Sequence, residues 1–378
     1  MKGSCAGREV RIVLIILAVL LGCILVLAGV LLAWSPGKPA SFLDENGTVL
    51  EGSIAEKLHV NIGGVEQGMF IRGRNTKNPV LLFLHGGPGM PEYFLAEKYP
   101  SGMEDHFTVC CWEQRGGGLS YGSGIPAESI TAEQLVSDAI EVTNYLRKRF
   151  GQEKIFLMAH SWGSFLGIRA AARAPELFHA YIGVAQVSQM LESERLAHAH
   201  MLAQYAAAGD EKMVKRLMDF PVAESESAVR SFFISNLRDE AMHKLGIGTM
   251  RSMKSVVTGI FLPVMQCRAY TLGEKINIWR AKAFLRSDTG LLDELFSTDL
   301  TIKVPRLEVP VYFFGGIHDY TVNHTLTKSY LEQLQAPAKG LYIFKESAHS
   351  PMFEEPGKFI QVMVEDVLNG KTALAEKP

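Results

Sequence analysis

The chain has 378 residues, of which 47% are hydrophobic and 21% are charged. Its 38 basic and 40 acidic side chains nearly cancel, so the basic excess of a general nucleic-acid-binding protein is missing and we expect no nucleic-acid partner. The hydrophobic content excludes a mainly disordered chain, and five cysteines are too few for a disulfide-stapled scaffold. The length allows two or three domains, or one large domain with an insertion.

The N-terminal segment predicts a membrane anchor. Residues 12–34 form a run of 23 residues without a charge. At about 1.5 Å per residue, a helix of this length crosses a hydrocarbon core of about 30 Å. Lys2, Arg8 and Arg11 precede the run, and basic residues favour the cytoplasmic side. We therefore expect residues 1–11 in the cytoplasm, a single membrane span, and the rest of the chain outside the cytoplasm.

Two other fates of this segment stay open. A cleaved signal peptide usually has an apolar region of only about 7–15 residues and a cleavage site made of small residues. This run is longer, and it ends in Ala-Trp-Ser-Pro at residues 33–36, a poor cleavage site. Residues 20–23 (Leu-Leu-Gly-Cys) resemble a lipoprotein cleavage box, but the sequence after Cys23 stays apolar for eleven more residues. An uncleaved anchor fits the sequence better than either alternative.

The rest of the chain divides into segments that differ in composition and in the pattern of apolar runs. Residues 35–53 are rich in Ser, Pro and Gly and predict a linker. In 54–187 and again in 305–378, short apolar runs alternate with helix-like segments, which predicts one α/β domain with a mostly parallel sheet between helices. Residues 188–304 lack strand-like runs, so we expect a helical cap inserted into that domain. The expected strands are 80–84, 107–112, 155–159, 181–187, 311–314 and 341–344, and the expected helices are 131–150, 164–174, 325–334 and 356–368.

A candidate nucleophile lies between the third expected strand and the helix after it. Residues 159–163 read Ala-His-Ser-Trp-Gly, which matches the nucleophile-elbow pattern G-x-S-x-G except for Ala in the first position. Small residues are needed on both sides of the serine because the sharp strand-to-helix turn brings neighbouring backbones into contact. The pattern alone is weak, since a serine in such a turn is often structural. Its position between a strand and a helix favours Ser161 as a nucleophile.

Two later loops offer the partners that a serine nucleophile needs. Its hydroxyl must be activated by a base, and in this type of fold the acid and the histidine follow late strands in that order. Asp319 follows the strand expected at 311–314, and His349 follows the strand expected at 341–344. Taken alone, Asp319 could be a helix cap and His349 a surface loop residue. Together they lie in the expected loops, in the expected chain order. We interpret His318 and His160 as supporting or packing residues.

The loop at residues 85–89 (His-Gly-Gly-Pro-Gly) predicts an oxyanion hole. Glycines allow backbone amides to approach a ligand closely, and acyl transfer needs such donors for the developing oxyanion. We expect the N–H groups of Gly87 and Trp162 to serve as these donors. The alternative is a simple Gly-Pro turn. No metal-ligand spacing and no dinucleotide fingerprint are visible, so we expect neither a metal nor a cofactor.

Three blocks together resemble the signature blocks of proline iminopeptidases, members of the α/β-hydrolase superfamily. The blocks are residues 85–89, residues 112–120 (Trp-Glu-Gln-Arg-Gly-Gly-Gly-Leu-Ser) and residues 160–164. The resemblance covers about residues 55–370 and implies an α/β-hydrolase fold with a helical cap. It also implies a triad of Ser161, Asp319 and His349, and it suggests substrate contacts from Gly86, Glu113 and Arg115.

The sequence departs from the family pattern at several positions. Glu113 replaces a usual Asp, Leu119 an Arg that is often present, and Ala159 a usual Gly. The family's aminopeptidases hold the substrate's ammonium group with acidic residues of the cap. None of the acidic residues considered in the helical block can be assigned that role from sequence; these are Glu192, Glu194, Glu224, Glu226 and Glu274.

The sequence therefore predicts a membrane-anchored serine hydrolase that works through an acyl-enzyme. The preferred interpretation is an aminopeptidase of the proline iminopeptidase type, with a short peptide or an aminoacyl amide as substrate. The first alternative is a carboxylesterase or lipase-like hydrolase, because the catalytic residues would be the same and an apolar cap suits an acyl chain. A more remote alternative is a non-catalytic receptor on this fold. Such receptors can lose a triad residue, and the presence of all three here argues against this alternative.

Overall fold

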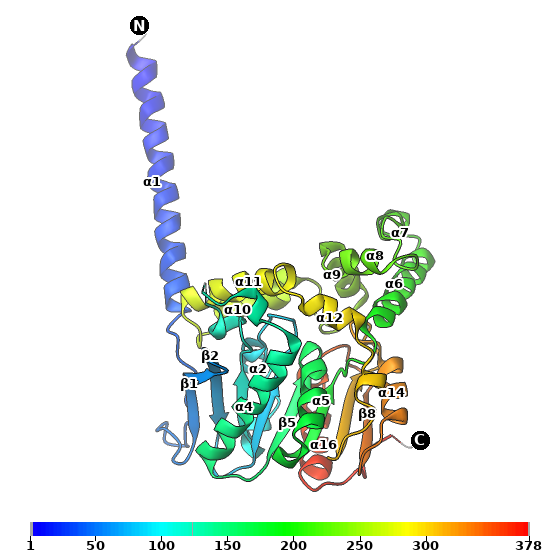
Figure 1. Ribbon diagram of the computed structural model, residues 1–378. Helices are drawn as coiled ribbons and strands as arrows, with labels where there is room; N and C mark the ends of the chain where they lie inside the picture. The colour runs from blue at the N-terminus through cyan, green and yellow to red at the C-terminus, as the bar shows by residue number, and fades with distance from the viewer. Residues whose placement is uncertain (1–2, 123, 377–378) are drawn as a thin grey trace.

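The computed structural model describes residues 3–122 and 124–376. Figure 1 shows one mixed α/β layer structure beneath a group of helices, with a long N-terminal helix projecting from it. The sheet has eight strands in the order β1-β2-β4-β3-β5-β6-β7-β8. The strands are β1 (Ile54–Ile62), β2 (Val65–Gly73), β3 (Val80–Leu84), β4 (Thr108–Trp112), β5 (Ile155–His160), β6 (Phe178–Val184), β7 (Val311–Gly316) and β8 (Lys339–Phe344). The predicted α/β-hydrolase architecture with a mostly parallel sheet is confirmed.

The sheet is antiparallel only at one edge. Strands β1 and β2 form a hairpin, and β2 pairs with β4 in the antiparallel sense, whereas all other neighbouring pairs are parallel. Neither β1 nor β2 was expected from the sequence. Strand β1 has no continuous apolar run because most of its residues are only half-buried at the edge of the sheet.

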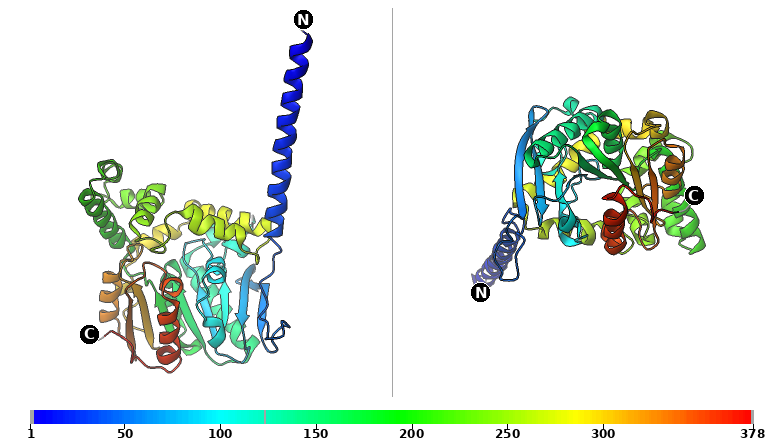
Figure 2. Two further views of the ribbon diagram at one scale, coloured as in Figure 1. Left: turned by 180° about the vertical axis from the view of Figure 1, so that it is seen from behind. Right: turned by 90° about the horizontal axis from the view of Figure 1, so that it is seen from below.

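Helices cover both faces of the sheet, as Figure 2 shows from below. One face packs against α4 (Ala132–Phe150), α5 (Trp162–Arg173) and α14 (His324–Gln333), and the other against α2 (Tyr93–Lys98), α15 (Pro351–Glu354) and α16 (Pro356–Val362). Burial on both faces explains why β3 and β5 are apolar throughout. A short helix α3 (Met103–His106) precedes β4.

A group of helices lies between β6 and β7 and covers the edge of the sheet at which the parallel strands end (Figure 1). Residues 188–304, all of which the structure describes, contain no strand beyond one isolated bridge. The helices of this cap are α6 (Met190–Ala207), α7 (Glu211–Met218), α8 (Glu226–Phe233), α9 (Asn236–Leu245), α10 (Leu262–Gln266), α11 (Leu272–Ser287), α12 (Leu291–Ser297) and α13 (Leu300–Lys303), with a π-helical turn at Val257–Phe261.

The N-terminal helix α1 (Gly3–Ala33) extends away from the cap side of the domain (Figure 1). Its stretch Glu9–Ala33 is long and apolar enough for a membrane span, a test that a signal sequence also passes. The end of the helix is tied to the cap: buried Lys275 of α11 donates hydrogen bonds to the carbonyl of Trp34 at 2.7 Å and to the hydroxyl of Ser35 at 3.0 Å. The chain after α1 therefore starts from a fixed point on the cap.

Candidate active site

The serine of the predicted elbow sits in a strained backbone conformation at the end of β5. Ser161 has φ 54° and ψ −124°, outside the regions that residues with a side chain normally adopt, and it forms the N-terminal boundary of α5. Its N–H donates to the carbonyl of Val184 at 3.0 Å. A Cβ on Gly163 would overlap the carbonyl oxygen of Leu84, so only glycine lets α5 start this close to β3. The tight turn exposes Ser161 to a cavity under the cap.

His349 and Asp319 form a hydrogen-bonded pair beside this cavity. The Nδ1 of His349 donates to Oδ2 of Asp319 at 2.8 Å, and both side chains are buried. The other carboxylate oxygen of Asp319 accepts the N–H groups of Thr321 at 2.8 Å and Val322 at 2.9 Å. These bonds fix the carboxylate and leave Nε2 as the nitrogen of His349 that can accept a proton. His349 lines the same cavity as Ser161.

The glycine-rich loop passes directly beside Ser161. A Cβ on Gly86 would lie 3.2 Å from Cβ of Ser161, and Gly87 has φ +129°, a conformation that favours glycine. Gly87 and Trp162 both line the cavity. Within the described residues, neither backbone N–H donates a hydrogen bond to the protein. Both amides therefore remain free to bind an oxyanion.

Gln114 ties this loop to the elbow. Its side-chain amide donates to the carbonyl of His85 at 2.8 Å and accepts the indole N–H of Trp162 at 2.9 Å. Its backbone N–H donates to Nε2 of His85 at 3.2 Å, while Nδ1 of that ring donates to the carbonyl of Gly86. One buried glutamine thus fixes the two predicted oxyanion donors in position relative to each other.

A buried ion pair lies against the same cavity. Nδ1 of His160 lies 2.9 and 3.0 Å from the two carboxylate oxygens of Glu92, and its Nε2 donates to the backbone carbonyl of His349 at 2.8 Å. Burial alone would lower the pKa of His160 and raise that of Glu92. Their mutual attraction outweighs burial, so the pKa of His160 is raised and that of Glu92 is lowered. The pair holds the main chain at His349, the base expected from the sequence.

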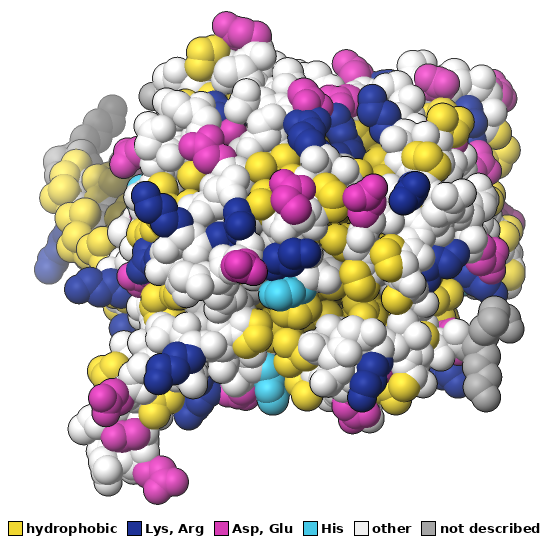
Figure 3. Space-filling model, turned by 60° about the horizontal axis from the view of Figure 1, so that its bottom comes forward, with side chains coloured by type: hydrophobic (Ala, Val, Ile, Leu, Met, Phe, Trp, Pro, Cys, Tyr) yellow, Lys and Arg dark blue, Asp and Glu magenta, His cyan; other side chains and the backbone are white. Residues whose placement is uncertain are grey.

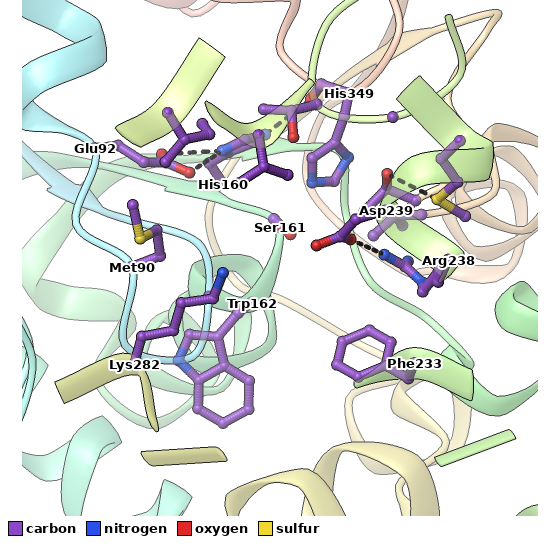
Figure 4. A pocket seen from close by; sticks show the side chains of 18 of the residues that line it. Met90, Glu92, His160, Ser161, Trp162, Phe233, Arg238, Asp239, Lys282 and His349 are labelled. Carbon is purple, nitrogen blue, oxygen red and sulfur yellow. Dashed lines mark hydrogen bonds and ion pairs between the residues drawn. The ribbon is translucent and has the colours of Figure 1, made fainter. Parts of the chain in front are cut away.

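The cap contributes charged side chains to the cavity, which has a volume of about 140 Å³. Arg238 of α9 pairs with buried Glu194 of α6, with Nε 2.8 Å from Oε2. Asp239, the next residue, lies 3.5 Å from the same guanidinium. Figure 4 shows the carboxylate of Asp239 and the ammonium of Lys282 reaching toward Ser161 from different sides. The site therefore brings a serine hydroxyl, a histidine paired with an aspartate, and both signs of charge to one cavity.

Comparison with known proteins identifies the family of this fold. The family model described as alpha/beta hydrolase fold matches residues 79–356. The chain belongs to the α/β-hydrolase family. A relative named probable aminopeptidase YbaC, from Bacillus subtilis strain 168, is 32% identical to this hydrolase over 315 residues, which cover 82% of this chain and 96% of the relative. The resemblance to aminopeptidases of this family is confirmed, and the chain is a hydrolytic enzyme.

Two solved structures are similar to the hydrolase in fold. The crystal structure of proline iminopeptidase from Mycobacterium smegmatis matches with a TM-score of 0.57 and 18% identity, covering 83% of this chain and 98% of that chain. The crystal structure of a membrane phospholipase A matches with a TM-score of 0.56 and 16% identity, covering 96% of this chain and 99% of that chain. Both likenesses concern the fold.

The three residues expected to contact the substrate do not line the cavity in the described part of the hydrolase: Gly86 only passes beside Ser161, and Glu113 and Arg115 have other partners. Glu113 is buried, accepts the N–H of Leu119 at 2.6 Å and accepts the hydroxyl of Tyr270. Burial raises the pKa of Glu113 to about 8, although both hydrogen bonds act against the rise. Arg115 forms a buried two-point pair with Asp138 at 2.7 and 2.9 Å. These contacts hold the loop after β4 and leave neither side chain facing Ser161.

Other residues of the site escaped the sequence analysis. Glu92, Asp239, Lys282 and Arg286 line the cavity, yet each stands in a stretch without a recognisable motif. Lys282 and Arg286 share a helix face because they are four residues apart, a spacing visible in the sequence. No signal in the sequence showed that this face would point at Ser161. Among the described residues, no group of three or more His, Cys, Asp or Glu side chains is placed to hold a metal ion.

Proposed function

We propose that this hydrolase is a serine aminopeptidase that cleaves short peptides or aminoacyl amides through an acyl-enzyme. The observation that carries the proposal is that the strained Ser161 and the hydrogen-bonded pair of His349 and Asp319 meet at one cavity. Ser161 Oγ attacks the carbonyl while Nε2 of His349 takes its proton, and Asp319 stabilises the imidazolium. The amides of Gly87 and Trp162 bind the oxyanion.

The second half of the reaction follows from the same geometry. His349 returns its proton to the leaving amine, which departs and leaves an ester between Ser161 and the acyl group. Water then attacks this ester with His349 again as the base, and Ser161 is regenerated. No step calls for a residue beyond the triad and the two amides.

The aminopeptidase interpretation is supported by charge in the cavity and by the relative from Bacillus subtilis. A substrate with a free amino terminus brings an ammonium group, which needs an acidic partner in a buried site. Asp239 supplies a carboxylate at the cavity wall, facing Ser161 (Figure 4). We propose Asp239 as the cap residue that receives the ammonium group. Turnover of prolyl and other aminoacyl substrates will show which N-terminal residue the enzyme prefers.

The decisive experiment labels the full-length chain with a fluorophosphonate probe. We expect labelling of the wild type and none of Ser161→Ala. The matched control is Ser137→Ala, which removes an exposed serine of α4 and should label like the wild type. Substrate class is then assigned by comparing prolyl and other aminoacyl anilides with short-chain aryl esters. Equal labelling of Ser161→Ala and the wild type would refute the catalytic assignment.

An ester hydrolase is the second candidate, favoured by α1 and by the apolar part of the cavity wall. Met90, Phe94, Met190, Phe233 and Met242 line the cavity beside the charged residues, and they suit an acyl chain. Faster turnover of aryl esters than of aminoacyl anilides, with no gain from a free amino terminus, would establish this candidate and overturn the aminopeptidase.

We further propose that α1 is an uncleaved membrane anchor with its N-terminus in the cytoplasm. Buried Lys275 donates to the carbonyl of Trp34, and Arg268 donates to that of Ala33 at 3.4 Å, so cleavage directly after Trp34 would remove partners of both side chains. Figure 3 shows acidic and basic side chains interspersed on the face turned away from the cap, which suits exposure to solvent. Protease added to intact cells should digest the domain after Trp34, and a spared domain would contradict this orientation.

A further inference from the structure

Two cations of α11 face the catalytic cavity without a carboxylate partner. Lys282 and Arg286 are four residues apart and therefore lie on one face of the helix, and both line the cavity with Ser161. Figure 4 shows the side chain of Lys282 extending toward Ser161. Within the described residues, no Asp or Glu side chain forms an ion pair with either cation.

The other cations of the cavity are held by carboxylates. Arg238 is held by Glu194, and His160 is held by Glu92. Asp239 makes only one 3.5 Å approach to Arg238, whose two-point partner is Glu194, so its carboxylate is left for a substrate cation. Among the described residues, the Nε of Arg286 is buried with no hydrogen-bond partner. An Arg donor left in this state loses its bonds to water without replacement, which is unfavourable unless a ligand completes it.

The two cations also stand close enough to affect each other. Burial, and in the same direction the charge of Arg286, lower the pKa of Lys282 to about 8. The carboxylate of Asp239 acts on both cations from a distance, but neither forms an ion pair within the described part of the chain, so the wall that they form carries net positive charge in a small, partly desolvated space. An anionic group bound there would offset both the burial and the mutual repulsion.

Helix α11 is fixed against the oxyanion loop. A Cβ on Gly89 would lie 2.8 Å from Cδ1 of Leu285 and 3.3 Å from the carbonyl oxygen of Ala281. The helix thus packs on the backbone of the loop that carries Gly87. Lys282 and Arg286 are therefore held beside the predicted oxyanion hole, whereas Asp239 reaches the cavity from α9.

We propose that Lys282 and Arg286 form a subsite for a carboxylate of the substrate, so that the preferred substrates are short peptides with a free C-terminus. A dipeptide carries an ammonium group at one end and a carboxylate at the other. Asp239 on one wall and the two cations on another match that pair of charges, and the cavity of about 140 Å³ favours a short molecule. This inference rests on the proposed aminopeptidase activity.

The test compares two substrates that differ only in this charge. We would measure kcat/KM of the full-length chain in detergent for prolyl-leucine and for prolyl-leucine amide. The wild type should prefer the free acid by about tenfold or more, the value of one good charge-assisted contact. Lys282→Met, Arg286→Met and the double variant should reduce that preference toward one. Arg280→Met, which removes an exposed cation on the same helix, is the matched control and should keep it.

Two results would overturn the subsite. The wild type would show no preference for the free acid, or the double variant would keep the preference. The second result includes equal losses of kcat/KM on both peptides, because equal losses leave the preference for the free acid unchanged.

A second measurement separates the subsite from the proposed activity. If the wild type cleaves neither peptide, the aminopeptidase proposal fails, but fluorophosphonate labelling of Ser161 can still be timed. N-acetyl-leucine should then slow the labelling more than N-acetyl-leucine amide does, and the double variant should lose this difference. Equal protection of the wild type by the acid and the amide would overturn the carboxylate subsite.

Discussion

Replacing Glu92 by Gln tests the buried ion pair beneath the active site. The side chains of His160 and Glu92 are only 2% and 10% exposed, so the pair belongs with buried ion pairs and not with the weak pairs of the surface. Glutamine keeps the shape of glutamate and removes its charge. His160 must then become neutral, keep its proton on Nε2 for the carbonyl of His349, and accept a hydrogen bond at Nδ1 from the new amide.

The expected cost follows from what this exchange retains. Removing one partner outright, as in Glu92→Ala, should cost about 3–5 kcal/mol because His160 is left buried beside an empty space. Glu92→Gln replaces a charge-assisted hydrogen bond by a neutral one, a difference of about 1–2 kcal/mol. For a chain of this size, that should lower the melting temperature by roughly 1–3 °C.

The pH dependence has a definite sign. The lowered pKa of Glu92 adds stability above its unfolded value near 4.5, and the raised pKa of His160 adds stability below its unfolded value near 6.5. The first contribution is lost as pH falls through the folded pKa of Glu92, and the second as pH rises through that of His160. The stability advantage of the wild type over Glu92→Gln should therefore be largest between about pH 4.5 and 6.5.

The assay is thermal unfolding of the full-length chain in detergent, followed by intrinsic fluorescence from pH 5 to pH 9. Glu51→Gln, which changes an exposed glutamate of the same charge, is the control. We expect its melting temperature to match the wild type at every pH. A gap between wild type and Glu92→Gln that is absent near pH 6, or that widens as pH rises from 7 to 9, would refute the assignment of a charged pair.

Three further predictions concern the elbow, the loop after β4 and the anchor. Gly163→Ala should prevent correct folding, because its Cβ would overlap the carbonyl oxygen of Leu84; soluble yield and melting temperature check this. Protonated Glu113 stabilises the wild type fully below its unfolded pKa of about 4.5, and this contribution is lost as pH rises to its folded pKa of about 8. Glu113→Gln should therefore gain stability relative to the wild type over this pH range. Thermal unfolding at pH 5 and pH 8 measures the difference. Lys275→Met should free the chain after α1, seen as faster limited proteolysis of the linker, and an unchanged digestion rate would argue against the tie.

The positions of the proposed triad residues were predictable because each is marked locally. A buried strand ends in a small-residue turn at Ser161, and Asp319 and His349 each follow an apolar strand by a few residues. Parallel strands end at one edge of the sheet, so residues after different strands come together without any long-range signal in the sequence. The same reasoning placed the glycine-rich loop at residues 85–89 beside Ser161.

The roles of Glu113 and Arg115 were not predictable in this way. Both follow β4 at the same edge, and the resemblance suggested substrate contacts. The structure turns them away from the cavity because Asp138 of α4 and Tyr270 of the cap are there to receive them. Their partners are separated from them by 23 and 157 residues. A single sequence carries no record of such pairings.

One helix, α11, joins the end of α1 to the cavity. The first turn of α11 holds the end of α1 through Lys275, its last turns present Lys282 and Arg286 to the cavity, and Leu285 packs on the backbone of Gly89. An α-helix of 16 residues is a stiff element, so α1 cannot shift against the domain without breaking the Lys275 contacts or moving Leu285. The orientation of the cavity relative to α1 is therefore set by the helix that contacts both.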